Sequence, residues 1–175
     1  MAPDQEPHPS LVRVSDPAES VQRLLRAAGE TVATAESLTG GRLAALLTGI
    51  PGASDVYVGG VVTYATELKA SLLGVPDRII EEHGVVSSEC AQAMATGVRA
   101  LTGATYGVAT TGVAGPAEQE GKPAGTVFVG IAGPDLVAAV ALELRGKRGQ
   151  IQDRTCREAL SAFEQVLRRE ETPLG

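Results

Sequence analysis

Short apolar runs of strand length alternate along this chain with segments of helical periodicity. The runs are rich in Val, Ala and Thr and lie at 31–35, 56–64, 106–110, 126–132 and 137–144. The helical segments lie at 17–28, 42–48, 67–73, 77–82, 88–101 and 150–169. Strands that alternate with helices favour a sheet covered on both faces, and the last two runs add an adjacent strand pair. We therefore predict an α/β fold, a three-layer α/β/α sandwich on a mixed sheet.

The predicted domain begins at Asp16, which can cap a helix that has Pro17 at its first position and ends at Gly29. A chain of 175 residues is about one domain's worth, and it shows no repeat and no linker. We expect one domain over residues 16–170. Residues 1–15 contain three prolines and no apolar run, so we expect a flexible segment that is neither a signal peptide nor a membrane anchor.

Composition excludes several classes of function. The formal net charge is −6, which disfavours binding to nucleic acid or to an anionic membrane surface. Nothing approaches the roughly 20 apolar residues of a membrane span, so the expected location is the cytoplasm. Cys90 and Cys156 lack the spacing of a zinc site, and the acidic residues lack metal-ligand spacing. We expect two buried or incidental thiols, no metal and no cofactor.

Three polar segments lie where predicted strands end, which is where open α/β sheets bind ligands. The first runs from Thr34 to Gly41. Ser37 lies between a strand and a helix, so its hydroxyl can stand beside backbone N–H groups that could hold a phosphate or an oxyanion. The alternative is that Ser37 or Thr39 only caps the following helix.

The second segment contains Tyr64 at a predicted strand end and Lys69 one turn into the next helix. A partly desolvated lysine can be neutral enough to take a proton from a serine, and a tyrosine hydroxyl can relay or orient that proton. The alternative is a solvated lysine and a tyrosine that packs over the rim of the sheet.

The third segment follows the strand at 106–110 and contains Thr111, Gly112 and Gly115. Its glycines permit close approach of the backbone to a ligand, although a mobile loop is an equal alternative. It matches neither a P-loop nor the dinucleotide fingerprint. Further along, the segment from Arg145 to Arg148 offers cations suited to a phosphate monoester, or simply a solvated basic turn.

Taken in order, these segments resemble the CinA C-terminal domain family, which includes bacterial nicotinamide-mononucleotide amidohydrolases. The likeness covers about residues 18–168. The matching stretches are Ala35-Glu36-Ser37-Leu38-Thr39-Gly40-Gly41, Val62-Thr63-Tyr64 with Lys69, His83-Gly84-Val85-Val86-Ser87, Thr111-Gly112-Val113-Ala114-Gly115-Pro116 and Lys122-Pro123-Ala124-Gly125-Thr126-Val127.

The resemblance implies a mixed, mostly parallel five-stranded sheet in a cytoplasmic enzyme that self-associates. The implied reaction converts nicotinamide mononucleotide and water to nicotinate mononucleotide and ammonia. Ser37 matches the family's nucleophile, and Lys69 and Tyr64 match the residues that assist it. The glycine-rich segments and the arginine before the last helix match the nucleotide-binding surface, which assigns substrate binding to Glu36, Thr39, Gly40, Gly41, Thr111, Gly112, Gly115 and Arg148.

This chain departs from the family pattern at three positions. Leu38 replaces a frequent cysteine, Lys147 replaces an aspartate, and Gln152 replaces an arginine. The alternative function is a non-catalytic, nucleotide-binding or regulatory domain linked to competence or DNA damage. A DNA-binding accessory role is opposed by the acidic charge.

Overall fold

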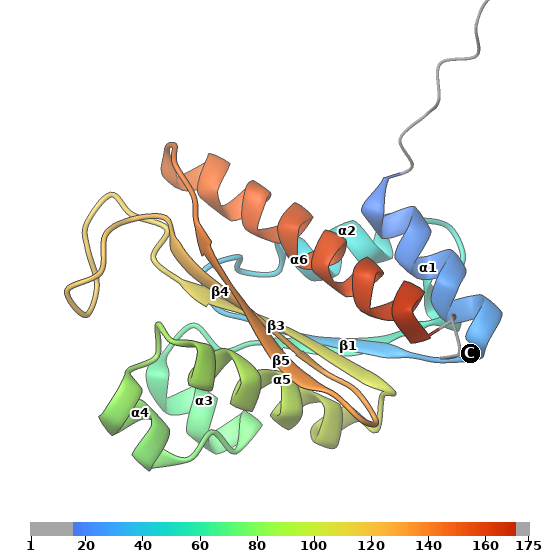
Figure 1. Ribbon diagram of the computed structural model, residues 1–175, viewed down its shortest axis with the longest axis horizontal. Coiled ribbons are helices and arrows are strands. Elements are labelled where there is room, and N and C mark those ends of the chain that lie inside the picture. Colours follow the sequence, from blue (N-terminus) through green and yellow to red (C-terminus); the bar gives the residue numbers. More distant parts are fainter. Residues whose placement is uncertain (1–15, 171–175) are drawn as a thin grey trace, which may run out of the picture.

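A five-stranded sheet lies between two layers of helices (Figure 1). The structure, a computed structural model, describes residues 16–170, so the segment 1–15 that we expect to be flexible lies outside the described residues. The elements are α1 (Pro17–Ala28), β1 (Val32–Glu36), α2 (Arg42–Thr48), the 3-10 turn η1 (Ala53–Asp55), β2 (Tyr57–Val62), α3 (Thr66–Leu73), α4 (Asp77–His83), α5 (Ser88–Thr102), β3 (Tyr106–Gly112), β4 (Thr126–Ala132), β5 (Val137–Glu143) and α6 (Arg148–Glu170).

The strand order is β2-β1-β3-β4-β5. β1 pairs in parallel with β2 and with β3, whereas β4 is antiparallel to both β3 and β5, so β4 alone runs against the other four strands. Helices α1, α2 and α6 cover one face of the sheet, and α3, α4 and α5 cover the other (Figure 1). The predicted three-layer sandwich on a mixed five-stranded sheet is confirmed.

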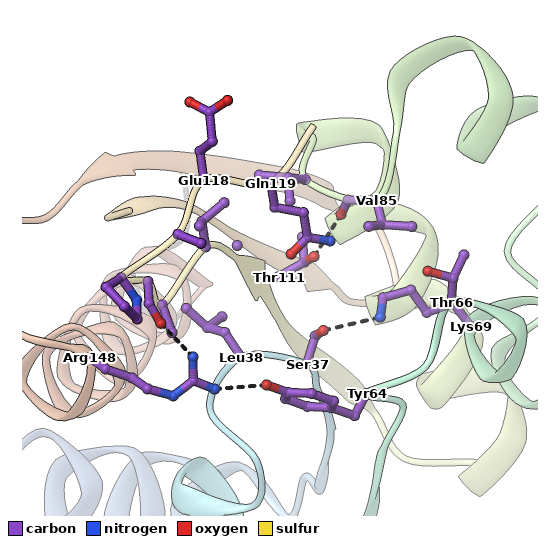
Figure 2. A pocket seen from close by; sticks show the side chains of 17 residues that line it. Ser37, Leu38, Tyr64, Thr66, Lys69, Val85, Thr111, Glu118, Gln119 and Arg148 are labelled. Carbon is purple, nitrogen blue, oxygen red and sulfur yellow. Dashed lines mark hydrogen bonds between the residues drawn. The ribbon is translucent and has the colours of Figure 1, made fainter. Parts of the chain in front are cut away.

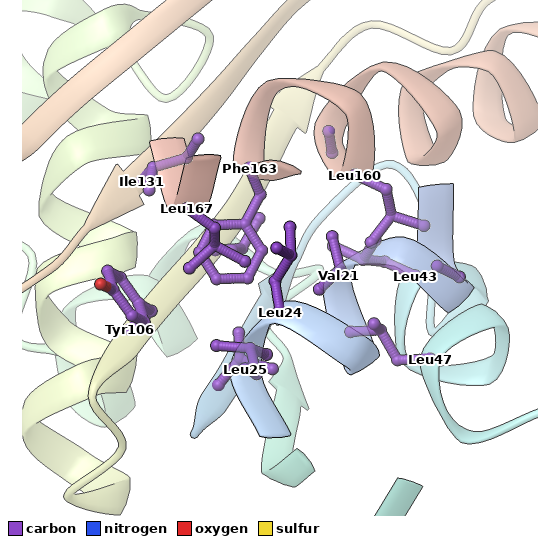
Figure 3. Close-up of a cluster of buried hydrophobic side chains, with 14 of the residues drawn as sticks. Val21, Leu24, Leu25, Leu43, Leu47, Tyr106, Ile131, Leu160, Phe163 and Leu167 are labelled. Carbon is purple, nitrogen blue, oxygen red and sulfur yellow. The ribbon is translucent and has the colours of Figure 1, made fainter. Parts of the chain in front are cut away.

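Each face of the sheet carries its own apolar core. Leu25, Val32, Val108 and Phe163 belong to the cluster beneath α1 and α6, where Phe163 meets the ring of Tyr106 edge-on at 5.3 Å (Figure 3). The cluster beneath α5 is built from smaller side chains, which lets that helix lie close to the sheet. Because side chains alternate along a strand, β1 directs Val32, Thr34 and Glu36 to one face and its alanines to the other.

The register of the parallel strands gathers the predicted polar segments at one edge. Glu36, the last residue of β1, pairs with Val62 of β2 and with Thr110 of β3. The residues that follow β1 and β2, and the last residues of β3, therefore lie beside one another.

Several boundaries differ from the prediction. β2 ends at Val62, so Tyr64 lies in the connection to α3, and β3 continues to Gly112, so Thr111 is a strand residue. The helix start at Asp16 is confirmed, because its side chain accepts a hydrogen bond from the N–H of Ala18. Between residues 16 and 170, none of the helices is long and apolar enough to cross a membrane.

Candidate active site

A cavity of about 300 Å³ opens at the carboxyl ends of the parallel strands. Its wall comes from the segment after β1, the β2–α3 connection with α3, the α4–α5 connection, the end of β3 with the loop that follows, and the first residue of α6 (Figure 2). Seven of the predicted site residues line it: Ser37, Tyr64, Lys69, Thr111, Gly112, Gly115 and Arg148.

Ser37 is the first residue after β1, and its N–H donates to the carbonyl of Thr110 as if it continued the strand. Its Oγ lies 3.1 Å from Nζ of Lys69, which also donates a 2.6 Å hydrogen bond to the carbonyl of Thr63 (Figure 2). The two side chains that the sequence put forward as nucleophile and base are therefore within hydrogen-bonding distance across 32 positions of the chain.

Lys69 is buried, with only 1% of its surface exposed. Among residues 16–170, no carboxylate lies within 4.0 Å of it, so its charge would be held without a counterion. Burial lowers the pKa of Lys69, and electrostatic interactions with Cys90 and Glu120 oppose the shift without reversing it. A lysine with a lowered pKa is present as the neutral amine at lower pH than an exposed one.

Tyr64 and Arg148 meet at the other end of the cavity. Nη2 of Arg148 donates to Oη of Tyr64 at 2.8 Å, and Nη1 donates to the carbonyl of Gly115 at 2.7 Å (Figure 2). The other cations of the same basic segment, Arg145 and Lys147, are exposed and do not line this cavity.

Glu36, Thr39, Gly40 and Gly41, which the resemblance assigns to substrate binding, do not line the cavity. The Glu36 side chain turns inward beneath α2, where Oε1 accepts from the N–H groups of Gly41 and Leu43 and from Oγ1 of Thr39, and Oε2 accepts from the N–H of Ala44. A carboxylate of the protein thus takes the amides that we expected to hold a phosphate or an oxyanion. The capping alternative is wrong for Ser37, because its side chain makes no hydrogen bond to the start of α2, where the buried Glu36 accepts from the backbone.

Glu36→Gln is expected to lower the free energy of unfolding by about 1–3 kcal/mol, since an amide has only one acceptor oxygen and would turn its own NH2 toward backbone donors. Urea unfolding of the variant measures the loss, with the exposed Glu143→Gln as the matched control. Equal stability of the two variants would show that the Glu36 carboxylate does not hold the start of α2.

Gly112 and Gly115 of the third segment are needed for packing within the protein, because a side chain at either position would collide with neighbouring residues. A Cβ on Gly112 would lie 2.6 Å from the carbonyl oxygen of Thr126, and one on Gly115, at φ +86°, would lie 2.7 Å from Cβ of Ala124. Thr111 is buried and donates to the carbonyl of Val85 at 2.6 Å. We predicted that these glycines let the backbone come close to a ligand. In the structure they also let it pack closely against the segment that leads into β4.

Glu120 is a residue of this site region that the sequence did not single out. Its two oxygens accept from the N–H groups of Val85 and Val86 at 2.9 and 3.0 Å, and this anchors the loop after β3 to a wall of the cavity. A Cβ on Gly84 would collide with the same carboxylate. The stretch around Gly84 and the segment around Lys122 both match the family, but nothing in either indicated that Glu120 joins them.

Two further predicted features are placed by the structure. Gln152 is buried and donates to the carbonyl of Leu38 at 2.8 Å, so the residue that replaces an arginine supports the segment after β1 from α6.

Cys90 and Cys156 are free and buried, as expected, and burial raises their pKa to about 11 and about 12. Within the described ranges, His, Cys, Asp and Glu form no group of three that could hold a metal ion.

The fold and the cavity define an α/β protein that holds a serine–lysine pair at the carboxyl ends of parallel strands. A model of the CinA C-terminal domain matches residues 14–167. The chain is 52% identical over 137 residues to a CinA-like protein of Frankia casuarinae, a match that covers 78% of this chain and 32% of that protein. It is 45% identical over 152 residues to a putative competence-damage inducible protein of Halalkalibacterium halodurans, covering 86% and 36%. This chain belongs to the CinA C-terminal domain family.

Solved structures agree with this assignment. A competence-damaged protein (CinA) superfamily protein from Klebsiella pneumoniae superimposes with a TM-score of 0.85 at 34% identity, covering 87% of this chain and 96% of that one. A competence/damage inducible protein from Agrobacterium tumefaciens gives 0.81 at 34% identity, covering 88% and 96%. The chain spans about a third of the length of the curated relatives that it matches.

Proposed function

We propose that this chain is an amidohydrolase that converts nicotinamide mononucleotide and water to nicotinate mononucleotide and ammonia. The observation that carries the proposal is the contact between Ser37 Oγ and a buried Lys69 that has no carboxylate partner in the described part of the chain. A protein that only binds a nucleotide has no need for a desolvated amine against a hydroxyl, so this contact favours an enzyme over the non-catalytic alternative.

The pair supports acyl transfer in two steps. In the first, neutral Lys69 takes the hydroxyl proton while Ser37 Oγ bonds to the carboxamide carbon; the C–N bond then breaks as the Lys69 ammonium returns the proton to the leaving nitrogen. Ammonia leaves, and an ester joins Ser37 to the nicotinoyl group. In the second step, Lys69 takes a proton from water, the hydroxide adds to the ester carbon, and Ser37 departs with that proton.

The negative oxygen of each tetrahedral intermediate needs a donor. The N–H of Leu38 directly follows the nucleophile, and it makes no hydrogen bond within residues 16–170. Leu38 lines the cavity. Since Glu36 already occupies the first amides of α2, we assign the oxyanion to the Leu38 N–H and not to that helix.

The two ends of the cavity suit the two ends of the mononucleotide: Ser37 and Lys69 lie at the end proposed for the carboxamide, and the Arg148 guanidinium lies at the end proposed for the phosphate. A reacting carboxamide at Ser37 leaves the ribose to extend toward Gly115 and the phosphate toward Arg148, the cation at the opposite end. A charge-assisted contact between guanidinium and phosphate is among the stronger polar contacts in proteins.

The proposal is tested by incubating the purified chain with nicotinamide mononucleotide and measuring ammonia and nicotinate mononucleotide together. We expect the two products in equal amounts. Binding of the mononucleotide by calorimetry without formation of either product would establish the non-catalytic alternative instead.

A further inference from the structure

The hydroxyl of Tyr64 is directed to Arg148 and not to the serine–lysine pair. Figure 2 shows the ring below Ser37, with Oη pointing away from Lys69 and toward the guanidinium. Among the hydrogen bonds of the described residues, none joins Tyr64 to Ser37 or to Lys69. The lysine is already engaged by Ser37 Oγ and the Thr63 carbonyl, so the geometry offers no route for a proton through Tyr64.

Within residues 16–170, Arg148 is held by neutral oxygens alone. Its two contacts are the carbonyl of Gly115 and the hydroxyl of Tyr64, and no carboxylate in residues 16–170 lies within 4.0 Å of its nitrogens. A guanidinium has five N–H donors, so several remain for a ligand. Fixed in direction and without a counterion, this cation is suited to an anion that enters the cavity.

The same contact determines what the Tyr64 hydroxyl can do. Because Nη2 of Arg148 donates to Oη, the phenol oxygen acts as an acceptor toward the arginine and its own hydrogen points elsewhere. Tyr64 is 59% exposed, and both residues line the cavity. The hydroxyl is therefore free to donate to an anion that the guanidinium also contacts.

We propose that Tyr64 is a positioning and specificity-determining residue for the substrate's phosphate: it holds Arg148 and donates to the same phosphate monoester, and it takes no part in proton transfer at Ser37. This inference rests on the proposed function for the identity of the substrate. It gives Tyr64 a different role from the one that the family resemblance implies.

The test compares Tyr64→Phe with the unchanged protein on nicotinamide mononucleotide and on nicotinamide riboside, which lacks the phosphate. We expect the ratio of kcat/KM for the mononucleotide to that for the riboside to fall about tenfold, the equivalent of one hydrogen bond, mainly through KM. The midpoint of the pH–rate profile should not move. Arg148→Ala should reduce the ratio by roughly tenfold to a hundredfold, and adding Tyr64→Phe to it should reduce the ratio little further, because both residues serve one phosphate.

Tyr57→Phe is the matched control, since it removes a tyrosine hydroxyl that bonds Thr34 and does not line the cavity. It should leave the ratio as it is. A loss of kcat by the same factor on both substrates in Tyr64→Phe, or a shifted pH midpoint, would overturn the proposal and restore Tyr64 as a proton relay.

A binding measurement separates this inference from the proposed reaction. Ribose 5-phosphate is titrated calorimetrically into Ser37→Ala protein with and without Tyr64→Phe, and we expect about tenfold weaker binding when the hydroxyl is absent. That result stands even if the unchanged protein releases no ammonia, in which case only the proposed reaction fails. Ammonia release together with equal binding of ribose 5-phosphate by the two proteins would instead contradict the role of Tyr64 alone.

Discussion

Ser37→Ala is expected to reduce ammonia release from nicotinamide mononucleotide by at least about 10³-fold, because the variant has no atom that can form the ester. The N–H that bonds Thr110 remains, and the Ser37 hydroxyl does not cap α2, so the fold should be unchanged. Initial rates measure the loss, while calorimetry should show that the mononucleotide still binds.

Ser71→Ala is the matched control for this variant. Ser71 is an exposed serine of α3 that does not line the cavity, so its replacement should leave the rate intact. If Ser37→Ala kept the activity of the unchanged protein, Ser37 would not be the nucleophile, and direct attack of water on the amide would have to be considered.

Lys69→Arg should be nearly inactive, since a guanidinium keeps its proton at any pH at which the protein is folded and so cannot accept one from Ser37. The expected loss is at least about 10²-fold, the lower end of what a general base contributes. In the unchanged protein the neutral amine is the active form, so activity should rise with pH through the pKa of Lys69. Burial places that midpoint below the ordinary lysine value of 10.5.

The pH–rate profile of kcat/KM measures this midpoint directly. Lys147→Arg is the control, because Lys147 is exposed and lies outside the cavity. Substantial activity in Lys69→Arg, or a rate that rises with pH nowhere below 10.5, would exclude Lys69 as the base.

The fold could be predicted in detail because the pattern of apolar runs and glycine stops is local. The predicted bounds 42–48 and 126–132 coincide with α2 and β4, and the parallel strands gather their ends as open α/β sheets do. The pairing of Ser37 with Lys69 could be predicted because both follow strands that end at the same edge of the sheet and both match the family's motifs. The burial of Lys69 could not be predicted, since the sequence equally allowed a solvated lysine.

What the sequence could not provide was the direction of individual side chains. Glu36 lies next to the nucleophile, yet the alternation along β1 turns it to the α2 layer, where a carboxylate replaces the ligand we expected at that helix. Tyr64 and Arg148 are 84 positions apart, and Glu120 and Val85 are 35 apart, so no spacing rule could connect them. These contacts depend on how the loops close, which the local pattern does not encode.

Arg148 is the first residue of α6, whereas Ser37 and Lys69 belong to the β1–β2 side of the sheet. The atoms proposed to break the amide and those proposed to select the anion are thus carried by separate parts of the chain, joined only across the cavity. Substitutions at the start of α6, such as one at Arg148, can alter which end group is selected while the bond-breaking pair keeps its geometry. Such a layout lets relatives diverge in ligand preference through a few positions of one helix, with no accompanying change in the reaction itself.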